Sequence, residues 1–225
     1  FENNIFKAER FNIPIISVGN LKVGGTSKTP CVIFLNGLFY QTNSIAVLSR
    51  GYGRKSRGFY EVNDSGDVNR LGDEPMLIKN KCLKAKVFVD ENRRRGIKKI
   101  CSLYNDVDLI LLDDAFQHRY VMRDVNILLT VYNDLYVDDN ILPLGRLRES
   151  PSGVERANIV IITKCPESLT LSESEEIKKR LKLDHSKSTF FSSIEYDNPV
   201  DLFSNELFVK NKHDSIVLVS GISSN

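Results

Sequence analysis

The segment from Val18 to Pro30 contains the residue types that bind nucleotide phosphates: two adjacent glycines, followed by Lys28 and Thr29. An apolar run at 13–18 precedes it, and a helical pattern with an apolar face follows. A strand, a glycine-rich loop and a helix N-terminus make up a P-loop, in which backbone N–H groups and the helix dipole bind phosphate oxygens. The lysine then reaches the terminal phosphates, and the threonine hydroxyl is placed for Mg²⁺. The predicted nucleotide-binding residues are Lys22, Val23, Gly24, Gly25, Thr26, Ser27, Lys28 and Thr29.

This loop departs from the generic pattern G-x-x-x-x-G-K-[ST], which would have glycines where this chain has Lys22 and Ser27. Ser27 carries a Cβ at a place that often needs a positive φ, so we expect the serine to cost backbone freedom. Taken alone, the segment could also be a glycine-rich turn with a surface lysine.

Two adjacent carboxylates, Asp113 and Asp114, end another apolar run. An apolar strand that closes on carboxylates is typical of a Walker B element, which holds Mg²⁺ directly or through water. Gln117 and His118 follow and add an amide and an imidazole to the same strand end. The alternative is an ordinary polar turn after a strand.

Asp73 and Glu74 begin a predicted helix. The helix dipole alone favours acidic residues in a first turn, so a role in starting the helix is the simpler interpretation. Phosphoryl transfer, however, needs a carboxylate near the acceptor hydroxyl to take or orient its proton. Asp73 is therefore a candidate general base.

Cations gather in two places, in the glycine-rich loop from Arg50 to Lys55 and in the run Arg93–Arg95 at the start of a predicted helix. Either cluster could be a solvated face. Cations at a helix N-terminus oppose the dipole, so the second cluster indicates an anion to bind, either a substrate phosphate or an anionic lipid. Arg148 and Glu149 place a cation beside an anion in a loop with proline and glycine.

Apolar runs and helical patterns alternate along the chain, which predicts an α/β fold with a mostly parallel β-sheet sandwiched by helices. Ligands of such sheets lie beyond the carboxyl ends of the strands, where the motifs above fall. The expected strands are 13–18, 44–48, 86–89, 108–112, 125–131, 158–163 and 215–220, and the expected helices are 29–41, 73–82, 92–104 and 172–181.

The composition narrows the class of protein. With 31 basic and 29 acidic residues among 225, the chain is too balanced for nucleic acid to be its main partner. Four widely separated cysteines without a C-x-x-C pair indicate reduced thiols. No apolar run approaches the roughly 20 residues of a membrane-spanning helix and no signal peptide is evident, so we expect this chain alone to be soluble.

Six motifs in this order resemble the tetraacyldisaccharide 4′-kinases, the lipid A kinases of Gram-negative bacteria. They are V-G-N-L-K-V-G-G-T-S-K-T-P at 18–30, L-S-R-G-Y-G-R at 48–54, G-D-E-P at 72–75, L-D-D-A-F-Q-H-R at 112–119, L-P-L-G-R-L-R-E at 142–149 and R-A-N-I-V-I-I-T-K-C-P at 156–166. The family usually has glycine at two positions where this chain has Ser27 and Ala115.

The resemblance implies a P-loop kinase domain over 1–225 that uses ATP and Mg²⁺ to phosphorylate the 4′-hydroxyl of a lipid A disaccharide 1-phosphate. It also implies that the enzyme acts as a peripheral protein at the cytoplasmic face of the bacterial inner membrane. The implied catalytic residues are Asp73, Glu74, Asp113, Asp114, His118 and Glu149, the implied Mg²⁺ ligands Thr29, Asp113 and Glu149, and the implied substrate-binding residues Arg50, Arg93, Gln117 and Arg148.

The resemblance also implies that family members carry an N-terminal membrane-docking helix and a smaller C-terminal domain, so we expect this chain to be a fragment. Two other classes of protein remain open. A P-loop switch or chaperone would bind nucleotide without a small-molecule acceptor, although Thr163-Lys164-Cys165-Pro166 lacks the aspartate of a guanine-reading motif. A membrane-surface binding module would explain the basic loops but not four carboxylates at strand ends.

Overall fold

The computed structural model describes residues 7–63, 65–82, 84–184, 186–196, 198 and 200, and the following account concerns these residues. They form an eight-stranded sheet in the order β3-β4-β2-β5-β1-β6-β7-β8. All neighbouring strands are parallel except β3 and β4. The strands are β1 (Ile15–Asn20), β2 (Ile45–Ser49), β3 (Tyr60–Val62), β4 (Lys86–Val89), β5 (Leu109–Leu112), β6 (Val125–Val131), β7 (Ile159–Thr163) and β8 (Ser188–Phe191).

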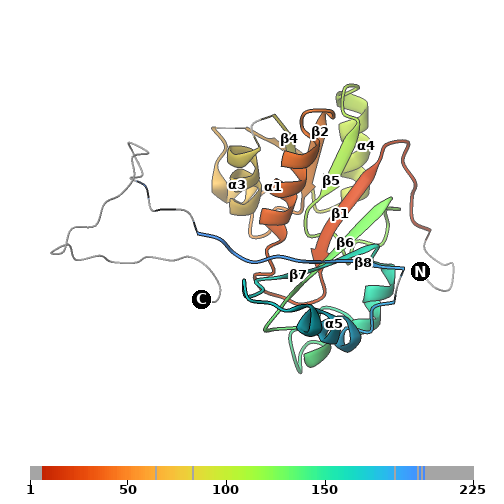
Figure 1. Ribbon diagram of the computed structural model, residues 1–225. Coiled ribbons are helices and arrows are strands. Elements are labelled where there is room, and N and C mark those ends of the chain that lie inside the picture. Colours follow the sequence, from red (N-terminus) through yellow and green to blue (C-terminus); the bar gives the residue numbers. More distant parts are fainter. Residues whose placement is uncertain are drawn as a thin grey trace.

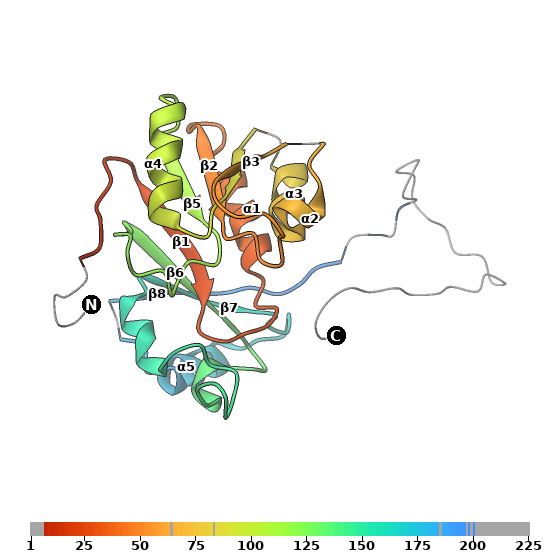
Figure 2. The ribbon, with the colours of Figure 1, turned by 180° about the vertical axis from the view of Figure 1, so that it is seen from behind.

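Helices cover both faces of this sheet, so the predicted α/β sandwich is confirmed. Helices α1 and α3 lie on one face and α4 on the other (Figure 1, Figure 2). Buried side chains of α1 and α3 belong to one apolar cluster of the core, and those of α4 to another. The α-helices are α1 (Lys28–Phe39), α2 (Val68–Leu71), α3 (Asp73–Lys81), α4 (Arg93–Leu103) and α5 (Leu171–Arg180), and the 3₁₀-helices are η1 (Tyr136–Asp138) and η2 (Pro151–Arg156).

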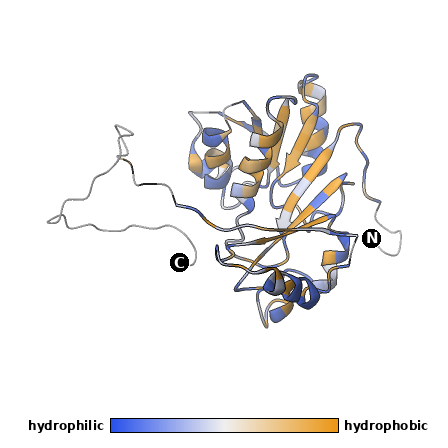
Figure 3. Ribbon diagram, viewed as in Figure 1, coloured by the Kyte–Doolittle hydropathy of each residue, from blue (hydrophilic) through white to orange (hydrophobic). Residues whose placement is uncertain are grey.

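The central strands are apolar along their whole length because both faces are covered. Every residue of β2 and of β5 is buried, and Figure 3 shows these strands as mostly hydrophobic. Continuous burial, rather than alternation, is typical of parallel strands between two helical layers. This feature explains why the runs of apolar residues predicted the inner strands.

The structure differs from the prediction at several short elements. Strands β3 and β8 and helix α2 were not predicted, because segments of three or four residues give almost no periodic signal. Strand β1 extends beyond the predicted end to Asn20, since its pairing with β6 continues to Leu129. The predicted strand at 215–220 lies outside the described residues.

All four cysteines are unpaired, as predicted. Cys82 and Cys165 are buried, whereas Cys101 is exposed on α4. Burial, followed by the nearby charge of Asp113, raises the pKa of Cys31 to about 12. Among the described residues, no helix is both long and apolar enough to cross a membrane.

Candidate active site

The loop between β1 and α1 has the form that the sequence predicted for a phosphate-binding loop. Asn20 ends β1, and its Nδ2 donates a hydrogen bond of 2.8 Å to Thr26 Oγ1. This bond ties the two ends of the loop together. Lys28 and Thr29 open α1, with Thr29 buried and the Lys28 side chain only 10% exposed. The loop is therefore closed by this hydrogen bond and leads directly into α1, whose first two residues carry a cation and a hydroxyl.

Ser27 adopts the left-handed conformation that the sequence led us to suspect, with φ 65° and ψ 31°. It is the residue that precedes α1, and its side chain makes no capping hydrogen bond. An L-residue in this region costs roughly 1–2 kcal/mol, whereas glycine adopts it freely. The serine therefore strains the loop without a compensating cap.

We expect Ser27→Gly to raise the free energy of unfolding by about 0.5–1 kcal/mol, because relief of strain exceeds the extra entropy of an unfolded glycine. Urea unfolding of the two proteins measures this difference. Ser27→Ala is the matched control, since it removes the hydroxyl but keeps the Cβ and the strain. Equal stability of the glycine and alanine variants would contradict the interpretation.

Asp113 directly follows β5 and is buried at the centre of the site. Its Oδ2 accepts a hydrogen bond of 3.1 Å from Ser49 Oγ, and its Oδ1 has no hydrogen-bond partner among the described residues. Burial, and after it the charges of Glu74 and Asp114, raise the pKa of Asp113 to about 6. An unpartnered, buried carboxylate oxygen is costly unless a cation binds it.

The residues around Asp113 suit Mg²⁺ bound together with nucleotide. Mg²⁺ takes oxygen ligands and is usually held by one or two carboxylates plus substrate phosphates, rather than by an all-protein cage. The described residues contain no group of three or more His, Cys, Asp or Glu side chains that could hold a metal ion. Asp113 Oδ1 is an unpartnered oxygen that suits such an ion, and the Thr29 hydroxyl stays a predicted ligand.

The raised pKa of Asp113 predicts a pH dependence of stability. Because this pKa, about 6, lies above that of an unfolded aspartate, about 3.9, the folded chain binds the proton more tightly. Without Mg²⁺, the contribution of Asp113 to the free energy of unfolding should fall by about 2–3 kcal/mol as pH rises from about 4 to 6, and should then stay constant. Urea unfolding of the wild type and Asp113→Asn across pH 4–7.5 tests this. Parallel stability curves would show that Asp113 titrates normally.

Asp114 lies beside two cations that come from separate parts of the chain. Arg148 Nη1 donates to both of its carboxylate oxygens at 2.8 and 3.0 Å, and Lys28 Nζ is 3.9 Å from its Oδ1. Burial is the main reason that the pKa of Glu74 is raised, and the charges of Lys28, Asp114 and Arg148 also affect this pKa. The structure thus brings Lys28, Glu74, Asp113, Asp114 and Arg148 into one charge cluster.

Asp73 is the first residue of α3 and is exposed to solvent. The N-cap of this helix is Gly72, and the Asp73 Oδ1 accepts only a local hydrogen bond of 2.9 Å from the Glu74 backbone N–H. Asp73 is therefore not the capping residue. Its position next to Glu74 places an exposed carboxylate beside the charge cluster.

A pocket of about 430 Å³ adjoins this cluster, and its lining is rich in arginine. His118 lines it with a buried Nε2 that has no hydrogen-bond partner among the described residues. Burial, followed by the charges of nearby arginines, lowers the pKa of His118 to about 4, so the imidazole is neutral. The lining residues are Val23, Arg50, Tyr52, Glu91, Arg93, Asp114, Gln117, His118 and Arg148.

Arg93 lines the pocket and is only 2% exposed, so it is not part of a solvated face, which was the alternative that the sequence left open. Its Nη2 donates to the backbone carbonyls of Asp113 and Asp114 at 3.1 and 3.3 Å, and its Nη1 to that of Asp90. Burial lowers the pKa of Arg93 to about 10. Much of its hydrogen-bonding capacity therefore supports the strand end that carries the two aspartates.

Gln117 and Glu149 lie next to the cluster. Gln117 Nε2 donates to Asn20 O at 2.7 Å and to Glu149 Oε1 at 3.1 Å. Both Glu149 oxygens accept from Arg156 Nη2, at 2.8 and 2.7 Å. The Mg²⁺-binding role of Glu149 stays a prediction, since its carboxylate is already paired.

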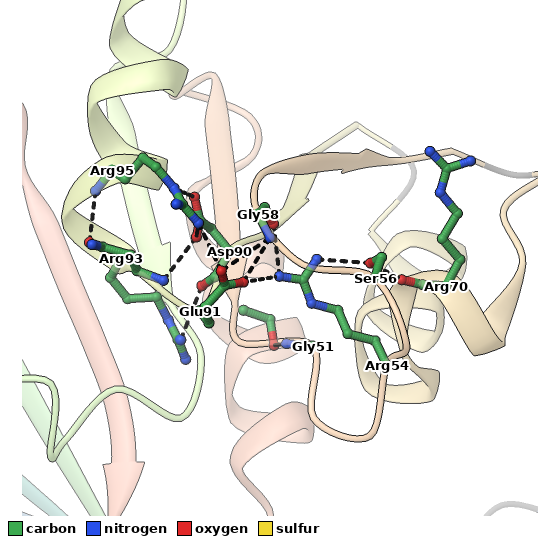
Figure 4. Close-up of polar contacts among 11 residues, drawn as sticks. Gly51, Arg54, Ser56, Gly58, Arg70, Asp90, Glu91, Arg93 and Arg95 are labelled. Atoms are coloured by element: carbon green, nitrogen blue, oxygen red, sulfur yellow. Dashed lines mark hydrogen bonds and ion pairs between the residues drawn. The ribbon is translucent and has the colours of Figure 1, made fainter.

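Glu91 is a residue that the sequence analysis missed. It is the second residue after β4 and anchors the loop between β2 and β3 (Figure 4). Its oxygens accept hydrogen bonds from the Gly58 backbone N–H at 3.0 and 3.1 Å, and one of them pairs with Arg54 Nη2 at 2.5 Å. Burial acts to raise the pKa of Glu91, but hydrogen bonds from its own N–H, Gly58 and Arg95 lower it to about 2. Arg50 and Tyr52 reach the pocket from this anchored loop.

The same loop turns at Gly51, which has φ 70° and whose missing Cβ leaves room for the Arg54 side chain. Glu91 and Ser49 could have been found from the sequence, because both stand at the carboxyl end of a parallel strand, where ligands of such sheets bind.

Lys22 does not point into the phosphate loop. Its Nζ lies 2.5 Å from Asp134 Oδ1 and 2.8 Å from Asp139 Oδ2, and its side chain is 4% exposed. The nucleotide-binding role of Lys22 stays a prediction for its backbone alone, because its ammonium group is already paired with Asp134 and Asp139.

Comparison with known proteins identifies the family. A family model described as tetraacyldisaccharide-1-P 4′-kinase matches residues 1–225. The tetraacyldisaccharide 4′-kinase of Flavobacterium johnsoniae is 44% identical over 226 residues, which cover 99% of this chain and 66% of that protein. That of Bacteroides fragilis is 42% identical over 232 residues, covering 100% of this chain and 62% of that protein.

The fold is also similar to a crystal structure of the "apo" form of LpxK from Aquifex aeolicus in complex with ATP. The TM-score is 0.70 and the sequence identity 32%, over 84% of this chain and 57% of that one. The chain spans about two thirds of the length of its curated relatives. The motifs, the fold and these matches agree, and the chain belongs to the tetraacyldisaccharide-1-P 4′-kinase family.

Proposed function

We infer that this chain carries the catalytic core of a kinase that transfers the γ-phosphoryl group of ATP to the 4′-hydroxyl of a tetraacyldisaccharide 1-phosphate. The observation that carries this inference is the meeting of Lys28, Asp114 and Arg148 at one side of an arginine-lined pocket. Cations close to a phosphate loop stabilise the charge that spreads over a transferring phosphoryl group. An adjoining pocket provides room for an acceptor.

In the proposed reaction, the acceptor oxygen attacks the γ-phosphorus, a new P–O bond forms, and the bond to the bridging oxygen of ADP breaks. The proton of the hydroxyl passes to Asp73, whose carboxylate is exposed beside the cluster. Lys28 and the loop N–H groups hold the phosphates, and Asp113 and Thr29 would hold Mg²⁺. When bound, Mg²⁺ neutralises phosphate charge and fixes the phosphate oxygens.

The pocket has donors that suit a phosphorylated sugar. Arg50, Arg93 and Arg148 supply cationic donors, and the neutral imidazole of His118 has one nitrogen without a partner among the described residues. Val23 and Tyr52, which are 37% and 79% exposed, add apolar surface at the same pocket. Such a rim suits an acylated acceptor presented at the cytoplasmic face of the inner membrane.

The test is to incubate the full chain with ATP labelled at the γ-phosphorus, Mg²⁺ and tetraacyldisaccharide 1-phosphate. We expect one phosphate to appear on the 4′-oxygen for each ADP released, and GTP to serve poorly. If the rate of ADP release is the same with and without the acceptor, the result would instead favour a P-loop switch or chaperone. Failure to bind ATP at all would contradict both.

A further inference from the structure

Lys22 carries a charged side chain at the start of the phosphate loop, in a position where the generic pattern has glycine. Its ammonium group contacts two carboxylates, Asp134 and Asp139, which come from the segment between β6 and η2. A lysine that is 4% exposed is costly to bury, so these two contacts hold it firmly in one place.

Arg146, from the same distant segment, completes the group. Its Nη2 lies 2.7 Å from Asp134 Oδ1, and its Nε lies 3.3 Å from Asp139 Oδ2. Two cations and two carboxylates thus balance one another. The hydrogen bond from Lys22, and after it that from the Asn140 backbone N–H, holds the pKa of Asp139 below its usual range. The Asp139 carboxylate is therefore charged at neutral pH.

The backbones on either side of this group are paired as well. Val23 N donates to Arg146 O at 2.9 Å, and Arg148 N donates to Leu21 O at 2.8 Å. Leu21 and Leu147 are fully buried beneath this pairing. The phosphate loop and the segment 146–148 consequently behave as one unit.

Arg148 emerges from this unit toward the active site. Its Nη1 reaches Asp114 at 2.8 Å and Gln117 Oε1 at 3.3 Å. Since a displacement of about 1 Å in a catalytic group can cost a hundredfold in rate, the anchoring of residue 148 decides how well its guanidinium meets the phosphates.

We propose that Lys22, with Asp134, Asp139 and Arg146, forms a clamp that fixes the segment 146–148 to the phosphate loop, so that Lys22 is a positioning residue acting through Arg148. The proposal rests on the proposed kinase function for its catalytic consequence. Its geometric part, the coupling of the two segments, does not depend on which acceptor the enzyme uses.

The experiment compares the full chain with Lys22→Met. We expect kcat to fall about tenfold while the Kd for ATP changes less than threefold, because the Lys22 ammonium group is paired with Asp134 and Asp139. In an Arg148→Ala background, Lys22→Met should lower kcat less than twofold further, since the group that it positions is gone. Amide hydrogen exchange at Val23 and Arg148 should become at least tenfold faster, because both amides bridge the clamped segments.

Arg180→Met is the matched control. Arg180 pairs with Asp138, the neighbour of Asp139, at 2.9 Å, but about half of each side chain is exposed. Its removal should leave kcat and both amides within twofold of the wild type. If Lys22→Met does not fold, Asp134→Asn weakens the same clamp at a residue that is more exposed than Lys22. It should change kcat and the two exchange rates in the same directions, but by smaller factors.

Three results would overturn the proposal: unchanged exchange at both amides, additive losses in Lys22→Met and Arg148→Ala, or ATP binding that weakens as much as kcat. A lower melting temperature with normal kcat per folded molecule would show a purely structural role. If the wild type does not phosphorylate the acceptor, the proposed function fails, while the exchange rates still decide whether the clamp exists.

Discussion

Asp73→Asn is expected to lower phosphoryl transfer by roughly a hundredfold or more while the affinity for ATP stays within about threefold of the wild type. Asparagine keeps the size of the side chain and an oxygen that can accept from the Glu74 N–H, but it cannot take a proton. Nucleotide binding depends on other residues, notably Lys28 and Thr29. The rate with tetraacyldisaccharide 1-phosphate and the Kd for ATP are measured separately in the full chain.

Asp67→Ala separates this catalytic effect from a loss of helix stability. Asp67 is the N-cap of α2, and its side chain accepts a hydrogen bond of 2.8 Å from the Asn69 backbone N–H. Its removal should cost about 1 kcal/mol of stability but leave the rate per folded molecule unchanged. If Asp73→Asn behaves like Asp67→Ala, then Asp73 only supports its helix and another group accepts the proton.

Lys28→Ala is expected to weaken ATP binding at least tenfold and to lower kcat/KM by roughly a hundredfold. Lysine at this position is a compact charge on a largely buried side chain, 3.9 Å from Asp114. Without it, the repulsion between the phosphates and the aspartates at the end of β5 is opposed by fewer cations. Isothermal titration with ATP and Mg²⁺ measures the change in affinity.

Lys178→Ala is a suitable control, because Lys178 pairs with Glu175 on the surface of α5 and such pairs contribute little. It should bind ATP as the wild type does. Unchanged ATP affinity in Lys28→Ala would mean that the loop before α1 is not the nucleotide site, whatever the family membership.

The sequence predicted those parts of the site whose chemistry is local. Lys28 and Thr29 are placed by the strand, loop and helix that surround them, so a short window contains the whole pattern. The same holds for Asp113, which follows an apolar strand and ends buried beside Ser49. Even the strain at Ser27 could be foreseen, since glycine is the usual residue where φ is positive.

Contacts between distant segments could not be predicted in this way. Lys22 is 112 residues from Asp134, and nothing near either residue indicates the other. Arg93 was expected near an anion because it begins a helix, and it does line the pocket, but nothing in the sequence indicated that its guanidinium bonds to backbone carbonyls 20 and 21 residues away. In both cases tertiary packing, not local pattern, decides what a cation does.

The distribution of the four thiols gives this protein a ready attachment point for a chemical probe. Only the thiolate reacts with maleimides and iodoacetamides, and the high pKa of Cys31 and the burial of Cys82 and Cys165 protect those three. Partial burial raises the pKa of Cys101 too, but this residue is exposed on α4, the helix that begins with Arg93 at the pocket. Cys101 lies eight positions after Arg93, a rise of about 12 Å along the helix axis. A fluorophore on Cys101 would therefore sit close enough to report ligand binding and far enough not to block it, without any cysteine being replaced.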